Sequence, residues 1–496
     1  MSSSETHAKV IIVGAGFSGL GLAIQLKQRG SQDFLVLERA EDVGGTWTAN
    51  TYPGCTCDIP SHLYSFSFAP NPNWSATYSP QPEIRDYLRR CADRYAVRGH
   101  VRTGVAVESA TWREETQVWE LQTSAGSYTA DVLVSAMGPL TEPKLPDVAG
   151  LADFEGKVMH SARWDHEYDL HGKRVASIGT GASAIQYVPE IAPVVEELYV
   201  FQRTAPWIMP HGNRPLTSFE QRLYRRLPRA QRIVRSAVYA SRELLVLGFA
   251  KQPKLMKLLE RLSRSHMRRQ ITDEQLRERV TPDYTLGCKR IIPSNSWYPT
   301  LTRPNVELVA SGLREVRARS VVDSEGVERD VDAIVLGTGY HVTDMPAAYQ
   351  VRGRDGVLLD EAWQGSPRAY LGTAVPGFPN FFMLLGPNTG LGHGSMVYMI
   401  EAQIAHLSNA IGAIEDAGAS VIEVRREANE AFNREVDEHM RGTVWDLGGC
   451  SSFYLDRTGR NATLWPDWTW RFRRLAADPD LSAYRLSSGK PAVTHA

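Results

Sequence analysis

The sequence contains little cysteine. Five of its 496 residues are cysteine, a small and odd number that argues against a disulfide framework and agrees with a reducing cytoplasm. Cys55 and Cys57 are separated by one residue, so they do not form the C-x-x-C pair of a disulfide reductase. No cluster of histidine, cysteine and carboxylate residues has the spacing of metal ligands. We therefore expect neither a metal site nor a redox-active cysteine pair.

An excess of charge of one sign is also absent. The chain has 55 Lys and Arg against 56 Asp and Glu, which predicts no broad attraction to nucleic acid or membrane. Residues 1–7 run directly into an apolar strand and do not resemble a signal peptide. The apolar run 244–250 is too short to span a bilayer, and we interpret it as a buried helix rather than a membrane contact. These absences favour a cytoplasmic protein and leave its oligomeric state open.

Short apolar segments rich in β-branched residues predict buried parallel strands. The first two, at 9–13 and 34–38, are separated by an amphipathic segment, which is the pattern of a βαβ unit. Residues 119–130 predict a hairpin that turns at Ala125 and Gly126. Further strands are expected near 131–138, 174–178, 308–311 and 332–336, and helices at about 396–417 and 426–440.

A glycine-rich turn follows the first strand. Gly14, Gly16 and Gly19 form G-x-G-x-x-G between a strand and a helix, the context in which this motif binds a dinucleotide. The glycines allow a tight turn, a close approach of the pyrophosphate and helix–strand packing, and the helix N-terminus attracts the phosphates. Glu38 ends the next strand, where a carboxylate can bind ribose hydroxyls and would repel a 2′-phosphate. This site is therefore expected to take FAD or NAD rather than NADP.

A second turn of the same kind begins at Gly179. Gly179, Gly181 and Ala184 form G-x-G-x-x-A, in which alanine still permits close packing. Ser183 lies inside this turn. The position that corresponds to Glu38 holds Arg203, followed by Thr204, and a cation beside a hydroxyl suits a 2′-phosphate. The second turn therefore favours NADPH over NADH.

Two turns of this kind predict an α/β fold with two Rossmann-like dinucleotide-binding domains. Residues 216–284 are rich in arginine and lysine, poor in glycine and helical in pattern, which indicates either a helical insertion or ordinary covering helices. We expect a first domain formed by residues 1–145 and 336–496, a second formed by 146–215 and 285–335, and a helical insertion at 216–284.

Three further segments carry recognisable patterns. Gly44-Gly45-Thr46-Trp47 precedes Tyr52-Pro53-Gly54, and glycine pairs allow backbone to lie against a planar ring on which Trp47 could stack. Leu336-Gly337-Thr338-Gly339-Tyr340 follows a buried strand. The third segment reads F-x-G-x-x-x-H-x-x-x-W-D and consists of Phe154, Gly156, His160, Trp164 and Asp165 with their neighbours.

Together these motifs resemble those of Baeyer–Villiger monooxygenases, which are class B flavoprotein monooxygenases. The resemblance covers nearly the whole chain, with the motifs in the family's order. The ending Trp164-Asp165 is similar to the branch that acts on aryl ketones such as 4-hydroxyacetophenone. Thr51 departs from the family, because many members have arginine before Tyr-Pro-Gly.

The resemblance implies roles for particular residues. Arg290 matches the family's active-site arginine, Asp58 the acidic residue that holds it, and Lys289 a lysine that contacts NADPH. Gly45, Thr46 and Trp47 would belong to the FAD site. His160 and Trp164 would order the two domains around the nicotinamide cofactor rather than act as acid and base. From the residues alone, Lys289 and Arg290 in a loop would more often be surface charges, and Asp58 could be a turn cap.

The resemblance also implies a reaction. NADPH would reduce FAD, O₂ would form a flavin peroxide, and the peroxide would attack a ketone carbonyl to give an ester or lactone plus water. The alternatives are a flavin-dependent N- or S-oxygenase and, from another class, a redox-sensing flavoprotein that oxygenates nothing. The expected partners are a small ketone and O₂, without nucleic acid or a membrane span.

Overall fold

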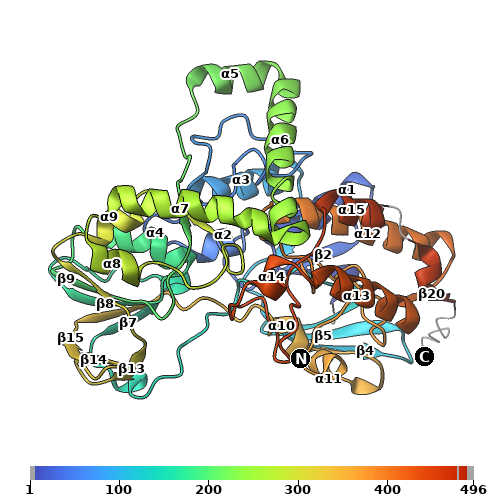
Figure 1. Cartoon of the computed structure of the whole chain (residues 1–496). Coiled ribbons are helices and arrows are strands. Elements are labelled where there is room, and N and C mark those ends of the chain that lie inside the picture. The colour runs from blue at the N-terminus through green and yellow to red at the C-terminus, as the bar shows by residue number, and fades with distance from the viewer. Residues whose placement is uncertain (1–5, 478–479, 489–496) are drawn as a thin grey trace.

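Two β-sheets flanked by helices form the body of the molecule (Figure 1). The computed structural model describes residues 6–477 and 480–488. The strands of the first sheet come from both ends of the chain, and those of the second come from its middle. This arrangement confirms the α/β fold expected from the two glycine-rich turns.

The first sheet has eight strands, in the order β17-β4-β5-β6-β1-β2-β3 with β18 paired to β6. Its centre is parallel because β1 pairs in parallel with both β2 and β6, and β4, β5 and β6 form an antiparallel extension. The strands are β1 (Thr6–Val13), β2 (Phe34–Leu37), β3 (Val101–Arg102), β4 (Val107–Arg113), β5 (Val118–Thr123), β6 (Gly126–Ser135), β17 (Val351–Arg352) and β18 (Phe381–Met383).

The second sheet has five parallel strands in the order β12-β9-β8-β16-β7. Its central strands are buried, in keeping with their continuous apolar sequence. The strands are β7 (Lys157–His160), β8 (Arg174–Ile178), β9 (Glu197–Phe201), β12 (Val306–Val309) and β16 (Ala333–Leu336), and a small antiparallel sheet is formed by β13 (Leu313–Val316), β14 (Ser320–Asp323) and β15 (Glu328–Asp330).

Helices cover both sheets. In the first unit α1 follows β1 and packs against α12, which in turn packs against α15, and in the second unit α4 follows β8. The helices of the body are α1 (Phe17–Gln28), α2 (Thr46–Ala49), α3 (Gln81–Arg94), α4 (Ala182–Ile191), α9 (Trp297–Leu301), α10 (Pro346–Gln350), α11 (Leu359–Trp363), α12 (Met396–Asp416), α13 (Arg426–Met440), α14 (Val444–Leu447) and α15 (Thr469–Ala477). Two short ladders pair β10 (Ile208–Met209) with β11 (Ile292–Pro293) and β19 (Val421–Val424) with β20 (Tyr484–Ser487).

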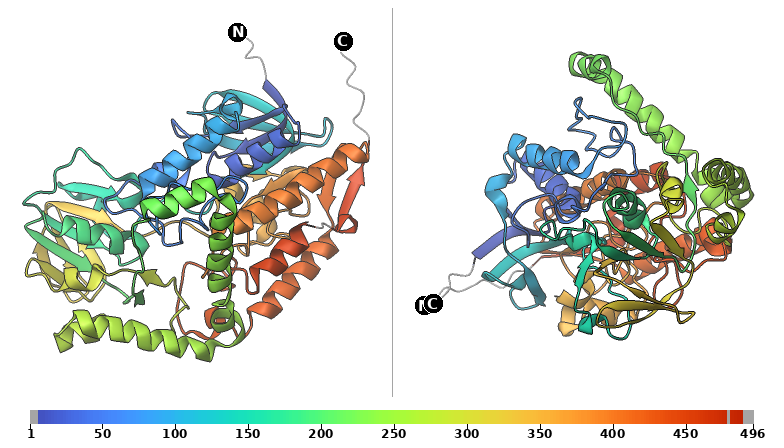
Figure 2. Two further views of the ribbon diagram at one scale, coloured as in Figure 1. Left: turned by 90° about the horizontal axis from the view of Figure 1, so that it is seen from above. Right: turned by 90° about the vertical axis from the view of Figure 1, so that its left-hand side faces the viewer.

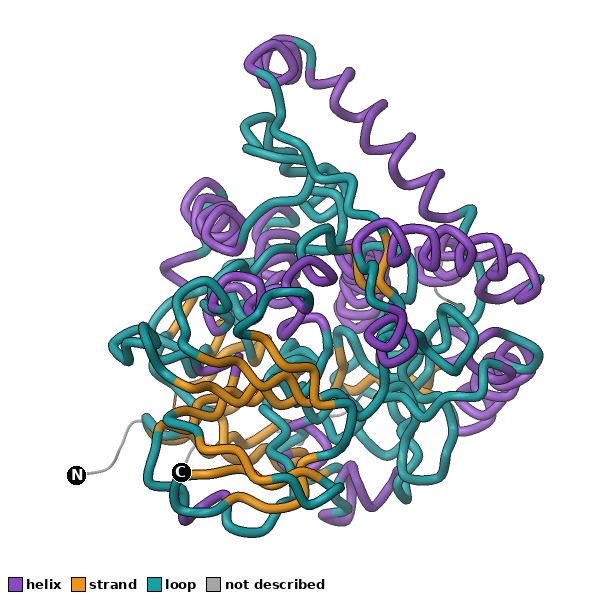
Figure 3. The backbone as a smooth tube through the Cα atoms, turned by 60° about the vertical axis from the view of Figure 1, so that its left-hand side comes forward, coloured by secondary structure: helices purple, strands orange, loops and turns teal. Residues whose placement is uncertain are grey.

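The helical segment between β10 and β11 stands apart from the sheets (Figures 2 and 3). It contains α5 (Ser218–Arg226), α6 (Pro228–Glu243), the π-helical turn η4 (Leu247–Lys251), the turn η5 (Pro253–Leu255), α7 (Met256–Gln270) and α8 (Glu274–Arg279). The expectation that the run 244–250 is fully buried is wrong, because Leu244 and Leu247 are exposed. Val246 and Phe249 are buried in the core, and Leu245 and Ala250 pack against it while partly exposed.

No helix among the described residues is both long and apolar enough to cross a membrane. The same residues contain no group of three or more histidine, cysteine and carboxylate side chains placed to hold a metal ion.

Candidate functional site

The first glycine turn has room for glycine alone at two positions. Gly14 has φ +105°, and a Cβ there would lie 2.7 Å from the carbonyl oxygen of Ala136. A Cβ on Gly19 would lie 1.8 Å from the carbonyl oxygen of Gly14, so α1 is pressed against the turn. Gly16 precedes α1, whose first turn has no side-chain cap. Its free N–H groups therefore suit an anionic group such as a pyrophosphate.

Glu38 and the Gly44-Gly45 segment complete this end of the first sheet. The buried Glu38 carboxylate accepts hydrogen bonds from the N–H groups of Ala15 at 2.7 Å and Ala40 at 2.9 Å. It is thus fixed beside the turn, with lone pairs left for ribose hydroxyls. Gly45 has φ +55°, and a Cβ there would lie 2.9 Å from Cα of Gly16.

Thr46 and Trp47 begin α2 directly after this glycine pair. The Trp47 ring is buried, its Nε1–H donates to the Tyr64 hydroxyl at 3.2 Å, and the two rings pack edge to face. The chain therefore places Trp47 in the wall of this site, held by an aromatic neighbour.

The second glycine turn repeats the geometry of the first. Gly179 has φ +102°, its N–H donates to the carbonyl of Phe201 at 3.0 Å, and a Cβ there would lie 2.6 Å from the carbonyl oxygen of Gly337. Gly181 differs, because a Cβ there would meet no atom within 4 Å. Packing therefore does not require glycine at 181, and the open space fits the approach of a cofactor phosphate. Ser183 lies in the first turn of α4.

Two cations lie beside the second turn. Arg203 follows β9 and is exposed, and the carbonyl of the next residue, Thr204, accepts a bond from the Thr180 hydroxyl at 3.4 Å. Burial and the neighbouring charge of Arg203 lower the pKa of Lys289, whose ammonium lies 5.0 Å from the centre of the Tyr284 ring. Two like charges held together form a site that favours a phosphate.

Arg290 and Asp58 form a two-pronged ion pair, although they are 232 residues apart. Nε of Arg290 donates to Oδ2 of Asp58 and Nη2 donates to Oδ1, both at 2.7 Å. Both side chains are partly exposed, at 30% and 20%, so the pair faces open space at its edge. Attraction by Asp58 raises the pKa of Arg290, which therefore remains cationic. The structure thus brings together the two residues expected to be catalytic.

Residues of the F-x-G-x-x-x-H-x-x-x-W-D segment hold the edge of the second sheet. Phe154 is buried, and a Cβ on Gly156 would lie 2.5 Å from the carbonyl oxygen of Asp332. His160 ends β7, where its Nδ1 accepts the N–H of Ala162 at 3.0 Å. Burial lowers the pKa of His160, so the ring is neutral. Its buried Nε2 makes no hydrogen bond to a described residue. This geometry supports a positioning role rather than acid–base chemistry.

The segment ends at Trp164 and Asp165. The Trp164 ring packs 5.5 Å from the ring of Tyr187, which belongs to α4. Asp165 forms an ion pair with Lys157 on β7. Trp164 therefore connects this edge of the sheet to α4, the helix that begins at the second glycine turn. Asp165 ties the end of the segment back to β7.

Three further features lie at or near the site. A disulfide joins Cys288 to Cys450, while the other three cysteines are buried and free. The cysteine count argued against disulfides, and the structure corrects that expectation, because Cys288 and Cys450 are brought together from segments 162 residues apart. Tyr454, four residues beyond Cys450, is buried, and its hydroxyl has no hydrogen-bond partner among the described residues. Burial raises the pKa of Tyr454 to about 12, with smaller effects from the charges of Arg290 and Asp58.

The third feature is a buried pair formed by His393 and Glu243. His393 Nε2 lies 3.6 Å from Oε2 of Glu243, and the carboxylate also accepts bonds from the N–H of Thr469 at 2.6 Å and its hydroxyl at 2.7 Å. This pair links α6 to the loop before α12 and to α15. Local sequence gave no signal for it, because the three residues are far apart in the chain.

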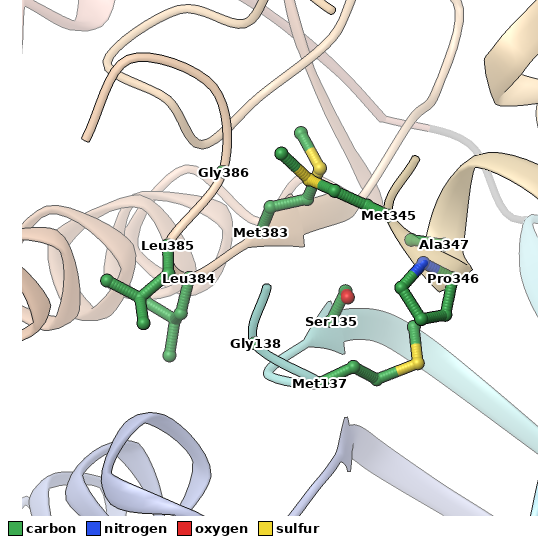
Figure 4. Close-up of a pocket in the computed structure, with 10 residues that line it drawn as sticks. All are labelled: Ser135, Met137, Gly138, Met345, Pro346, Ala347, Met383, Leu384, Leu385 and Gly386. Carbon is green, nitrogen blue, oxygen red and sulfur yellow. The ribbon is translucent and has the colours of Figure 1, made fainter. Parts of the chain in front are cut away.

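A small cavity lies at the ends of β6 and β18 (Figure 4). It is lined by the side chains or backbone of Ser135, Met137, Gly138, Met345, Pro346, Ala347, Met383, Leu384, Leu385 and Gly386. Because this lining has no charged group, we assign no chemistry to it.

Comparisons with known proteins agree with this geometry. A family model for pyridine nucleotide-disulphide oxidoreductases matches residues 11–239. A Baeyer–Villiger monooxygenase of Streptomyces coelicolor is 50% identical over 98% of this chain and 94% of its own length. Among solved structures, cyclohexanone monooxygenase from Rhodococcus sp. Phi1 bound to NADP+ has a TM-score of 0.87 at 29% identity, over 98% of this chain and all of that one. OTEMO in complex with FAD and NADP also has a TM-score of 0.87, at 28% identity and with the same coverage. The chain therefore belongs to the Baeyer–Villiger monooxygenases, flavoproteins that depend on FAD and NADPH.

Proposed function

We propose that this enzyme inserts one atom of O₂ beside the carbonyl of a ketone. The reaction consumes a ketone, O₂, NADPH and a proton, and it gives an ester or lactone, NADP+ and water. The observation that carries this proposal is the fixed pair of Arg290 and Asp58, a permanent cation aimed by a carboxylate. We place the reaction in the cytoplasm.

The residues present fit both cofactors. We assign FAD to the first turn and Glu38, in a domain formed by 1–145 and 336–496, and NADPH to the second turn in 146–215 and 285–335. Support comes from the uncapped N-terminus of α1, from the open space at Gly181, and from the cations Arg203 and Lys289. When bound, reduced FAD supplies the activated oxygen.

Arg290 performs the electrostatic part of the reaction. Its guanidinium presents N–H donors in a fixed plane, and Asp58 engages Nε and Nη2, which leaves Nη1 free to donate toward the substrate. A donor placed in this way stabilises the oxyanion that forms when oxygen adds to the carbonyl carbon. Asp58 acts through Arg290 by fixing the plane of the guanidinium.

The substrate class is expected to be cyclic or aryl ketones. The structural likeness to cyclohexanone monooxygenase supports a cyclic substrate, and the Trp164-Asp165 ending supports an aryl ketone. The buried Tyr454 hydroxyl lies where it could donate to a polar group of either.

The proposal is tested with the purified yellow protein, NADPH, O₂ and a panel of aryl, cyclic and long-chain ketones plus thioanisole, with products identified by mass spectrometry. We expect esters or lactones from the wild type. In Arg290→Ala their rate should fall by about 10²–10³-fold, because one oxyanion donor is lost. Arg290→Lys is the matched control, since it keeps the charge without the fork. Sulfoxide alone would indicate an S-oxygenase, and hydrogen peroxide alone a flavoprotein that oxygenates nothing.

A further inference from the structure

Helix α6 is polar on the face that packs against the body of the protein. Gln231, Arg235, Tyr239 and Glu243 recur every four residues, so they share one side of the helix. Gln231 donates to the carbonyl of Asn71 at 2.7 Å, and Arg235 donates to the carbonyls of residues 62 and 65 at 2.7 and 2.9 Å. Tyr239 and Glu243 bond to Thr469. These contacts fix which side of α6 faces inward.

The outward side of α6 carries exposed apolar residues among polar ones such as Arg232 and Ser236. Ile233 is 69% exposed and Leu244 is 61% exposed, and they continue to Leu247, which is 39% exposed. Because the polar contacts anchor the opposite side, the helix cannot rotate to bury these residues.

The following helix presents apolar residues in the same manner. Leu255, Leu258 and Leu262 are 45%, 61% and 46% exposed, at the spacing of one helical face. Phe219 and Leu227, on α5 and just after it, are 69% and 57% exposed. We call residues 216–270 the arm. It holds eight of the eighteen exposed large apolar side chains in the described part of the chain. Exposed apolar side chains are therefore concentrated in the arm.

The arm is also strongly basic. Residues 216–270 contain fourteen Lys and Arg against three Glu, a net charge of +11, and a chain with net charge −1 therefore carries −12 elsewhere. Within the described residues, only Arg235 and Lys251 of these fourteen form ion pairs. The net charge of the whole chain is therefore close to zero although the arm is strongly cationic. The arm, with its exposed leucines, stands away from the sheets (Figures 1 and 2).

We propose that the arm docks on an anionic lipid bilayer, with its leucines in the interfacial region and its free cations on the headgroups. Helices with apolar side chains on one face and Lys and Arg beside them bind in the plane of such an interface. A second copy of the chain fits less well, because a two-fold contact would set one arm of charge +11 against another.

The docking surface continues toward the reaction site, an inference that rests on the proposed function. Helix α14 packs against η4, so Leu447, which is 67% exposed, lies next to the arm. The same segment leads through Phe453, 48% exposed, to Tyr454 near Arg290. A ketone dissolved in the bilayer would therefore meet an apolar surface that leads to the site, which makes lipid-soluble ketones the substrate class.

The test measures co-sedimentation of the FAD-loaded, full-length protein with vesicles. Vesicles of phosphatidylcholine alone are compared with vesicles that also contain phosphatidylglycerol. We expect binding to the second kind only, and weaker binding as salt is raised, because charges on a surface are screened. The variant Leu244→Ser with Leu258→Ser should lower the vesicle partition coefficient by about 100-fold, roughly tenfold for each leucine removed from the interface. The matched control is Leu145→Ser with Val327→Ser, two residues that are 60% and 48% exposed outside the arm, which should bind like the wild type.

Turnover of a water-soluble ketone, measured in parallel, should be equal in all three proteins. If no ketone is converted but the vesicle results stand, the proposed function fails and the docking surface does not. Equal binding to both kinds of vesicle, or no binding to either, overturns the docking proposal. So does a light-scattering mass that shows a dimer in the wild type and a monomer in the arm variant, because the occupant is then a second copy.

Discussion

At the scale of single residues, we attribute the choice of nicotinamide cofactor to Arg203 and Lys289. Arg203 and Lys289 come from segments that flank the helical arm, yet the charge of one lowers the pKa of the other. Two cations so close repel each other in the empty site, and a bound 2′-phosphate relieves that repulsion. Their proximity therefore gives a physical basis for the preference for NADPH that Arg203 alone suggested.

Replacing Arg203 by alanine should reduce this preference. A hydrogen bond to a charged group contributes about 1.5–3 kcal/mol, so we expect kcat/KM for NADPH to fall by about 10–100-fold while that for NADH changes little. Steady-state rates with each cofactor measure the ratio. An equal fall with both cofactors would show that Arg203 supports the fold rather than the phosphate. Arg319→Ala, an exposed arginine on another part of the surface, is the control.

At the scale of the element, the two glycine turns need glycine for different reasons. Gly19 is required by packing, since a Cβ there would lie 1.8 Å from a carbonyl oxygen, whereas Gly181 has open space around it. Gly181→Ala should therefore leave the melting temperature and the FAD content unchanged but raise KM for NADPH, because the methyl group occupies the space that the phosphate approaches. Gly19→Ala should lower both FAD content and melting temperature. A Gly181→Ala protein that binds NADPH normally would contradict this assignment.

The disulfide joins two elements that meet at the site. Cys288 precedes Arg290 by two residues, and Cys450 precedes Tyr454 by four, so the bond ties the arginine loop to the C-terminal segment. Because it closes a segment of 162 residues, its loss should lower the free energy of unfolding by about 2–5 kcal/mol. Titration of the denatured protein should find three free thiols, and five after reduction. Cys450→Ser should unfold like the reduced wild type, and four free thiols in that variant would confirm the pairing.

Prediction from sequence succeeds where the signal is local. The hairpin β5–β6, the glycine turns and the helices at 396–416 and 426–440 follow from contiguous patterns, and the structure confirms them. The pairing of Asp58 with Arg290 spans 232 residues, and only a family resemblance could anticipate it. The pair of His393 and Glu243, the disulfide and the exposure of Leu244 depend on how distant segments pack. The hydrophobicity of the run 244–250 predicted that Leu244 is buried. In the structure, the polar contacts of α6 orient the opposite side of the helix inward, and Leu244 is exposed.

At the scale of the whole molecule, two buried histidines tie distant parts together. His62 lies under α6, where Gln231 contacts its ring at 3.2 Å, and His406 on α12 lies 2.7 Å from the hydroxyl of Tyr484 in the C-terminal strand. Burial lowers the pKa of each to about 4, from the usual 6.5 of a histidine. Acidic pH should therefore weaken the packing of the arm and of the C-terminal strand against the rest of the protein.

The sign of the pH effect follows from these two values. The unfolded chain binds protons at both histidines below about pH 6.5 and the folded chain does so only near pH 4, so unfolding takes up protons in between. The stability they contribute is complete above pH 6.5 and is lost as the pH falls to about 4, on the order of 3 kcal/mol for each histidine. The ion pair with Arg214 lowers the pKa of Glu220 to about 2, so carboxylates of this kind lose their contribution to stability only below pH 4.5, the usual pKa of a glutamate. The free energy of unfolding, measured with denaturant between pH 7 and 5, therefore reports mainly on the histidines. In the variant His62→Gln with His406→Gln, this free energy should fall less steeply as the pH is lowered. An unchanged slope in that variant would mean that other groups control acid stability.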